Sequence, residues 1–468
     1  MADEEDLPDR LVPNRVDGDE VSRRRLIRGT AAAGATVGSA STAGCTDLLD
    51  EEDADETTPE DDEEETPDGA ADDDEGSPDD ADDGDEATPE ADDADGETPE
   101  ANDDEAATRQ GYVFVFNTGD MSVSVVDALT DELLETAYIG ATASFPANQY
   151  ATREEGIETL WLNVEGGVKG YDPGTLEEAV DLETGSDSNW QEVTPDGEHL
   201  VVSAREPTHA QYRIDADPDS EGFGEVTGEI DRGEAAPCDV TIGPDGEYAY
   251  VPDLQGDTLT VIDVPAFEIA AQVEVDPVME GADAAQPYMD TASWGGEYLA
   301  VEYLEGDHGT EGIWDISDPT DPEELVRLTE EDGIGAGGTT SEFSADGDLL
   351  YLFTPDTEDI TVIDVEAREV EDRLDVGGET FAGTWDPGLE KLYVPVQTTD
   401  EVVVLAEGKI HERIGVGSAP YGATARDVRP DSGAMDRLLA TFANMGVPLG
   451  GEGTTYCMGD CYCPGDCD

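Results

Sequence analysis

The sequence predicts an all-β fold from residue 111 onward, and three observations support this prediction. Short stretches alternate between apolar and polar residues, turn signals come about every ten residues, and a unit of about 40 residues recurs. One copy follows Asp245-Gly246 and contains strand segments at 248–251 and 258–264, and another follows Asp346-Gly347. Four antiparallel strands per unit, arranged radially, make a β-propeller, which leaves only short sheet edges.

The number of units predicts seven four-stranded blades. Asp-Gly supplies the positive φ of the tight first hairpin, and each blade buries both faces against its neighbours. The segments assigned to the third strands are 122–127, 168–171, 211–215, 259–264, 312–316, 360–365 and 401–405. The first unit lacks an innermost strand, and we expect segment 421–428 to supply it and so to close the ring. Segment 437–444 is either an added outer strand or the start of an eighth blade, so eight blades are the alternative.

The units share a motif order. Pro244-Asp245-Gly246 precedes Tyr250-Val251, Val261-Ile262-Asp263 ends a third strand, and Val416-Gly417 precedes Pro420. In this order the units resemble the YVTN family of seven-bladed β-propeller repeats over about residues 111–430. Relatives of this repeat family include the haem-binding propeller of periplasmic nitrite reductases and the heavy chain of quinoprotein amine dehydrogenases. The resemblance implies the fold and assigns no function, because functional sites are grafted onto folds.

The composition is strongly acidic. Lys and Arg total 21 against 119 Asp and Glu, and residues 50–105 hold 32 acids without a base. Such a chain repels itself at low salt, whereas at molar salt the Debye length falls to about 3 Å and the repulsion is screened. The composition therefore resembles that of extreme-halophile archaeal proteins. It argues against nucleic acid as a partner, since no basic stripe is present to meet phosphates.

The N-terminus carries an export signal. Arg23-Arg24, followed by Arg25, Leu26 and Ile27, resembles the twin-arginine motif, and a weakly apolar stretch follows it over 29–44. Thr42-Ala43-Gly44-Cys45 resembles a lipobox, in which the Cys45 thiol receives a lipid. The order of these parts resembles that of a haloarchaeal lipoprotein exported by the twin-arginine pathway. We expect it on the outer face of the cell membrane.

These patterns divide the chain into four segments. Residues 1–45 are the signal with its lipobox, and 46–108 are a disordered acidic linker with Thr-Pro pairs, too polar to offset its ordering entropy. Residues 109–446 are the propeller, and 447–468 are a Cys-rich tail. The linker is expected to act as a stalk between the membrane and the propeller.

The tail contains a second candidate site. Cys457, Cys461, Cys463 and Cys467 lie within eleven residues, close enough for four thiolates to surround one ion tetrahedrally. Soft sulfur ligands suit Cu(I) or Zn. Two disulfides are the alternative, which an oxidising exterior favours. Cys238 stands apart and is expected to be a small core residue.

Two histidines mark a possible binding face. His209 and His308 are predicted to lie in loops on one rim of the propeller, where imidazole could ligate haem or metal. Haem-binding relatives need several converging histidines, and with four in the whole chain we expect solvated loop residues and no haem. No catalytic constellation is visible.

The sequence thus favours a binding or accessory module on the cell surface, with a protein or small molecule bound at the propeller rim and no enzymatic activity. The alternative is a redox or metal-handling protein that uses copper or zinc at the Cys tail.

Overall fold

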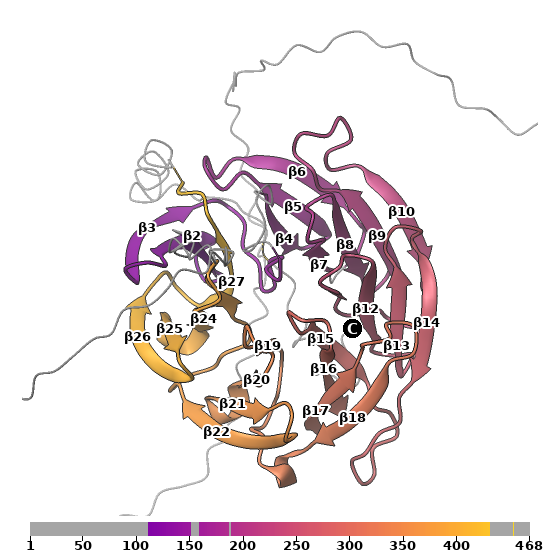
Figure 1. The fold of residues 1–468 in the computed structure, drawn as a ribbon. Helices are drawn as coiled ribbons and strands as arrows, with labels where there is room; N and C mark the ends of the chain where they lie inside the picture. The colour runs from indigo at the N-terminus through magenta and orange to yellow at the C-terminus, as the bar shows by residue number, and fades with distance from the viewer. Residues whose placement is uncertain (1–110, 151–158, 187–188, 431–452, 454–468) are drawn as a thin grey trace, which may run out of the picture. The chain divides into compact units, whose positions relative to one another are not determined.

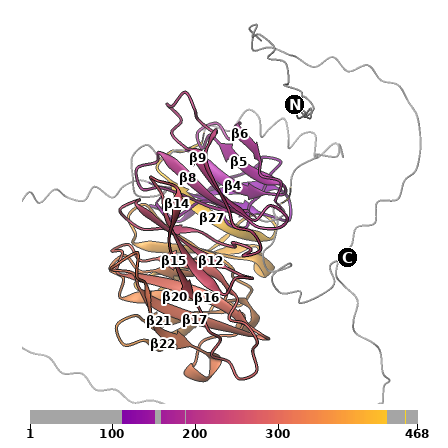
Figure 2. The same cartoon turned by 90° about the vertical axis from the view of Figure 1, so that its right-hand side faces the viewer.

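A computed structural model describes residues 111–150, 159–186, 189–430 and Gly453. In this part of the chain seven antiparallel sheets are arranged as the blades of a ring (Figure 1). Figure 2 shows the ring from the side, with β20, β21 and β22 of one blade next to one another. The export signal, Cys45, the linker, segment 437–444 and the four tail cysteines lie outside the described residues.

Each blade runs from an inner strand to an outer strand. Blade 1 comprises β27 (Pro420–Arg426), β1 (Tyr112–Asn117), β2 (Ser122–Asp127) and β3 (Glu132–Tyr138). Blade 2 comprises β4 (Leu160–Val164), β5 (Gly167–Tyr171) and β6 (Glu178–Glu183). Blade 3 comprises β7 (Asn189–Val193), β8 (His199–Ala204), β9 (Ala210–Asp215) and β10 (Val226–Asp231). Blade 4 comprises β11 (Thr241–Ile242), β12 (Tyr248–Asp253), β13 (Thr258–Asp263) and β14 (Glu268–Glu274).

The remaining blades follow the same order. Blade 5 comprises β15 (Pro287–Ala292), β16 (Tyr298–Glu305), β17 (His308–Asp315) and β18 (Glu323–Leu328). Blade 6 comprises β19 (Ser341–Phe343), β20 (Leu349–Thr354), β21 (Asp359–Asp364) and β22 (Glu369–Asp375). Blade 7 comprises β23 (Thr384–Trp385), β24 (Lys391–Val396), β25 (Glu401–Ala406) and β26 (Lys409–Gly415). Three single-turn 3-10 helices are η1 (Glu330–Asp332), η2 (Pro355–Thr357) and η3 (Gln397–Thr399).

The prediction of seven blades is confirmed, and so is the closure of the ring. β27 pairs antiparallel with β1, from Tyr112 opposite Arg426 to Asn117 opposite Pro420. Figure 1 shows this C-terminal strand, in yellow, beside the indigo strands of blade 1. Each of the seven predicted third-strand segments overlaps the strand that pairs with the outer strand of its blade.

Blade 2 departs from the four-stranded pattern, since its sheet contains three strands. The inner position is taken by an irregular connector, residues 141–150, and the backbone N–H of Ala147 donates to the carbonyl of Trp161 at 3.1 Å. Figure 1 labels β4 as the inner strand of this sheet.

Apolar side chains fill the spaces between blades. Phe114 of blade 1 packs with Leu162 of blade 2, and both are fully buried. Val115 and Tyr393 bury the closing interface between blades 1 and 7. The inner strands are therefore mostly buried, whereas the outer strand β26 is mostly exposed. No helix that the structure describes is long and apolar enough to span a membrane.

The first hairpin turns of blades 3, 4 and 6 follow the predicted Asp-Gly chemistry. Gly246 has φ +71° between β11 and β12, and Gly347 has φ +75° between β19 and β20. In blade 7 the positive φ falls on Leu389, at +55°, and not on Gly388. There the Asp386 carboxylate holds the turn by accepting hydrogen bonds from the backbone N–H groups of residues 388, 390 and 391.

Candidate functional site: a carboxylate-lined cavity in the channel

The connector 141–150 enters the central channel and binds the inner edges of the blades. The backbone N–H of Asn148 donates to both carboxylate oxygens of Glu192 in β7, at 3.1 and 3.2 Å. Its side-chain amide donates to the Gly383 carbonyl at 2.8 Å and to Glu342 of β19 at 3.4 Å. Asn148 therefore links blades 3, 6 and 7.

Neighbouring residues of the connector reach the other blades. The Gln149 amide donates to the Ala292 carbonyl of β15 at 3.2 Å, and its oxygen accepts from the Thr241 hydroxyl of β11 at 2.8 Å. The Thr424 hydroxyl of β27 donates to the Ala147 carbonyl at 2.8 Å. With the bond from Ala147 to blade 2, the connector is hydrogen-bonded to all seven blades.

Beside the connector lies a cavity of about 60 Å³, which is large enough for a few water molecules. None of the described residues that line it is basic. The polar lining residues are Asn148, Gln149, Gln191, Glu192, Asp239, Thr241, Asp290, Thr291, Thr340, Ser341 and Glu342.

Burial raises the pKa of every acid in this cavity. The pKa of Glu192 rises to about 8, although the two connector N–H groups and the nearby Arg426 guanidinium oppose the rise. Burial raises the pKa of Asp239 to about 7. The pKa of Glu342 lies well above its usual range because of burial and, secondly, because of the Glu192 charge.

Asp290 is the least satisfied acid of the cavity. Its side chain is 4% exposed, and neither of its carboxylate oxygens accepts a hydrogen bond within the described chain. Burial and the charges of Asp239 and Glu302 raise its pKa well above the usual range. The side-chain oxygen of Gln191, 3% exposed, also lacks a donor.

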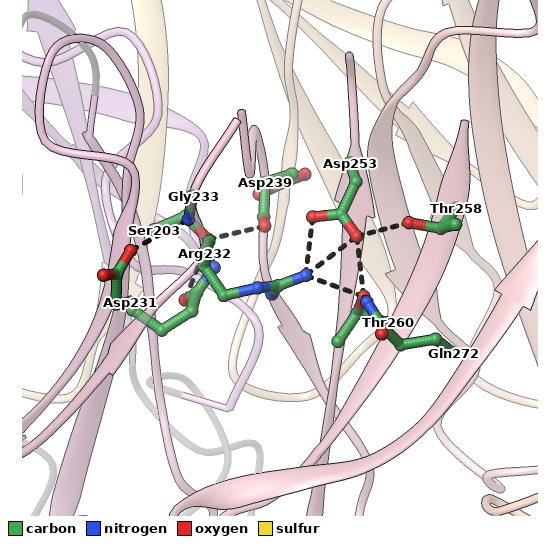
Figure 3. Close-up of polar contacts among 10 residues, drawn as sticks. Ser203, Asp231, Arg232, Gly233, Asp239, Asp253, Thr258, Thr260 and Gln272 are labelled. Atoms are coloured by element: carbon green, nitrogen blue, oxygen red, sulfur yellow. Dashed lines mark hydrogen bonds and ion pairs between the residues drawn. The ribbon is translucent and has the colours of Figure 1, made fainter. Parts of the chain in front are cut away.

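The loop that presents Asp239 is fixed by a buried ion pair (Figure 3). Arg232 Nη2 lies 2.8 Å from each carboxylate oxygen of Asp253 and donates to the Thr260 hydroxyl at 2.7 Å. At the other end of the loop, the Ser203 hydroxyl donates to the Asp239 backbone carbonyl at 2.7 Å. Asp239 Oδ2 in turn accepts from the Asp290 backbone N–H at 3.2 Å, which joins blades 4 and 5.

Aromatic side chains form one wall of the cavity. Phe145 and Trp190, which both line it, have ring centroids 5.5 Å apart. Phe145 also meets Tyr421 edge to face at 5.6 Å, and Tyr421 stacks on Phe381 at 4.6 Å. This wall gives the acidic cavity an apolar side and so contributes to its low local polarity.

The structure places the predicted rim histidines away from this cavity. His209 lies in the turn between β8 and β9, and His308 begins β17 in the next blade but one. His308 Nδ1 is 3.6 Å from a Glu330 carboxylate oxygen. Within the described ranges, no three His, Cys, Asp or Glu side chains converge as a metal cage. Cys238 is fully buried, as predicted for a core residue.

A wider groove lies between the hairpin turns of blades 6 and 7, on the rim opposite to the one that carries His209 and His308. Its volume is about 1270 Å³, and Lys391, Lys409 and His411 line it. Lys391 is already satisfied, because its ammonium group lies 2.7 Å from Asp131 and 3.1 Å from the Ala128 carbonyl. The groove is therefore a weaker candidate than the channel cavity.

Sequence reasoning missed the acids of the cavity, since they do not stand out among 119 acidic residues. The sequence does contain a regularity that points to two of these acids. Glu192 and Glu342, like Thr241 and Thr291, each lie five positions before the turn glycine of their repeat. Polar residues at a fixed position on otherwise apolar inner strands indicate a polar channel. The sequence of the connector, residues 141–150, shows no comparable regularity.

No protein-family model matches the chain, and no curated protein matches it in sequence. Among solved structures, the periplasmic gluconolactonase of Pseudomonas aeruginosa has a TM-score of 0.53 at 18% identity, over 68% of this chain and 99% of that chain. A protein from Lactobacillus plantarum has a TM-score of 0.54 at 15% identity, with the same coverage. At these identities the likeness shows the propeller fold alone, and membership of the YVTN family stays a prediction.

Proposed function

We propose that this chain is an exported binding module, held on the outer face of the membrane by a lipid on Cys45, and that its ligand occupies the channel cavity. The observation that carries the proposal is the preformed cavity. It is walled by inner strands and by the connector, and it contains acceptor oxygens on Asp290 and Gln191 to which no described residue donates. Such a site suits a small electropositive ligand.

The location is supported by the order of the N-terminal motifs. Cell fractionation tests it. We expect the full chain in the membrane fraction and accessible to protease on intact cells. Cys45→Ala is expected to be released into the medium, and Arg23→Lys/Arg24→Lys to remain inside. Membrane retention of Cys45→Ala would contradict the anchor.

Mass spectrometry of the exported full chain tests the binding site. We expect the native mass to exceed the denatured mass by a small bound species. Ala382→Leu fills part of the cavity, so this variant is expected to lose the excess mass. Ala367→Leu, at an exposed turn in blade 6, is the matched control and is expected to keep it. Equal native and denatured masses for the unaltered protein would refute ligand binding in the cavity.

The gluconolactonase named among the structural neighbours suggests a direct check for an enzyme. Small-molecule sites usually enclose about 300–1,000 Å³. The cavity, at about 60 Å³, is several times smaller, so a sugar lactone does not fit it. We expect no hydrolysis of gluconolactone. Turnover that is lost in Glu192→Gln would overturn the non-enzymatic proposal.

Metal handling by the Cys tail is a second candidate, and the spacing of Cys457, Cys461, Cys463 and Cys467 favours it. Metal analysis and thiol counting of protein purified without reductant test it. About one equivalent of copper or zinc, lost in Cys461→Ser/Cys463→Ser, would support it. Absence of both metal and free thiols would indicate disulfides.

A further inference from the structure

Asp290 lacks the partners that a comparable buried acid has in this protein. Asp253 is fully buried and pairs with Arg232, with the hydroxyls of Thr258 and Thr260 as further donors. Asp290 is 4% exposed, and no described residue donates to either of its oxygens. An uncompensated buried charge is strongly destabilising. An ionised Asp290 therefore needs a positively charged partner from outside the described chain.

Other oxygen atoms line the same cavity on consecutive blades. Asp239, at the entry to blade 4, accepts the backbone N–H of Asp290. Gln191, on the inner strand of blade 3, lines the same cavity, and its side-chain oxygen has no donor within the described ranges. Glu192 and Glu342 complete the set, and both contact Asn148 of the connector. The cavity thus presents carboxylate and amide oxygens from four blades.

These donors match one class of ligand. Hard divalent cations prefer carboxylate and amide oxygens, whereas soft ions prefer thiolate and imidazole. Neither His nor Cys is among the described residues that line the cavity. A volume of about 60 Å³ accommodates an ion with a few waters.

We infer that the channel cavity binds one hydrated hard divalent cation, of the Mg²⁺ or Ca²⁺ class, anchored by Asp290 and Asp239 with Gln191 as a neutral oxygen ligand. The inference rests on the proposed function and names the ligand class of that site. Since no three acidic, His or Cys side chains of the described chain form a ready cage, water fills most coordination positions, as is usual for Mg²⁺.

Calorimetric titration tests the inference. The full chain is stripped with a chelator in molar monovalent salt, which screens surface acids to about 3 Å, and is then titrated with MgCl₂ or CaCl₂. We expect one site for at least one of the two ions. The binding constant of Asp290→Asn is expected to fall at least tenfold. Asp321→Asn, on an exposed turn of the same blade, is the matched control and is expected to bind as the unaltered chain does.

Thermal melting separates loss of ligand from misfolding. The divalent ion is expected to raise the melting temperature of the unaltered chain and of Asp321→Asn, and to leave that of Asp290→Asn unchanged. Without the ion, Asp290→Asn is expected to melt no lower than the unaltered chain, because no described residue donates a hydrogen bond to the Asp290 oxygens that the substitution would remove. If Asp290→Asn fails to fold, Asp239→Asn replaces it, with the same expectations for ion binding and for the effect of the ion on the melting temperature.

Two results of the magnesium and calcium titrations overturn the inference. One is the absence of a saturable site for either ion, and the other is equal binding by Asp290→Asn and the unaltered chain, which would place the ions on surface acids. Saturable binding of methylammonium chloride in place of both ions would also overturn it, while leaving the proposed function intact. Failure of all three probes, together with equal native and denatured masses, would refute the proposed function itself.

Discussion

Replacing Arg232 with Met is expected to lower the free energy of unfolding by about 3–5 kcal/mol, the cost of removing one partner of a buried ion pair. The guanidinium lies 2.8 Å from each oxygen of Asp253, and the two side chains are 1% and 0% exposed. Water therefore cannot replace the lost charge. Asp253 keeps the hydroxyl donors of Thr258 and Thr260, so the cost stays within that range and not above it.

Thermal unfolding in constant molar salt measures the effect. An unfolding entropy of about 2.1 cal/mol/K per residue over a domain of about 320 residues converts 3–5 kcal/mol into a fall of about 4–7 °C in the melting temperature. Arg413→Met is the control, since Arg413 and Glu401 form an exposed pair, 38% and 36% exposed. Such surface pairs contribute about 0–1 kcal/mol.

A double variant distinguishes loss of the pair from loss of packing. In Arg232→Met/Asp253→Asn the neutral amide still accepts from the threonine hydroxyls, and no uncompensated charge remains. We expect the double variant to be more stable than Arg232→Met. The reasoning is wrong if Arg232→Met costs no more than the Arg413→Met control, or if the double variant is destabilised by the sum of the single changes.

Three further predictions follow from the fold. A chain that ends before β27 loses the strand paired with β1, so its ring stays open. Calorimetry of this chain is expected to show no cooperative unfolding transition. A transition like that of the full chain would refute closure of the ring by β27. Phe116 is fully buried, so Phe116→Ala is expected to lower the free energy of unfolding by about 3–5 kcal/mol in the same thermal assay. Leu129 is 54% exposed, and Leu129→Ala is expected to lower it by less than about 0.5 kcal/mol. Similar losses in the two variants would contradict the packing. Burial raises the pKa of Glu302 to about 8, above its unfolded value, so its contribution to stability is complete below about pH 4.5 and is lost as the pH rises toward 8. Melting of chelated protein between pH 5 and 8 is expected to show a shallower decline in Glu302→Gln, and identical slopes would refute the raised pKa.

Much of the fold could be predicted from the sequence because the repeat is local. The Asp-Gly turns, the alternating strands and the missing inner strand of the first unit each involve a few consecutive residues. β27 was predicted from a single unmatched segment after the last repeat. The one exception in the repeat, the connector in blade 2, could not be predicted, because residues 141–150 are held by hydrogen bonds to residues as far away in sequence as Thr424.

The cavity could not be predicted for a related reason. Glu192, Asp239, Asp290 and Glu342 are separated by about 50 residues each, and in this composition an acid carries little information on its own. Only closure of the ring brings them around Asn148, and only burial makes their charges costly.

The sequence by itself determined the repeat, the number of blades and the strand that closes the ring, since hydrophobic alternation and turn chemistry act between near neighbours. The tertiary structure alone decided which polar residues face the channel, which of them have partners and how much space remains between them. Those properties depend on the distances between segments of different blades, and sequence spacing does not determine such distances. The unsatisfied oxygens of Asp290 therefore became visible only when seven inner edges were placed around one axis.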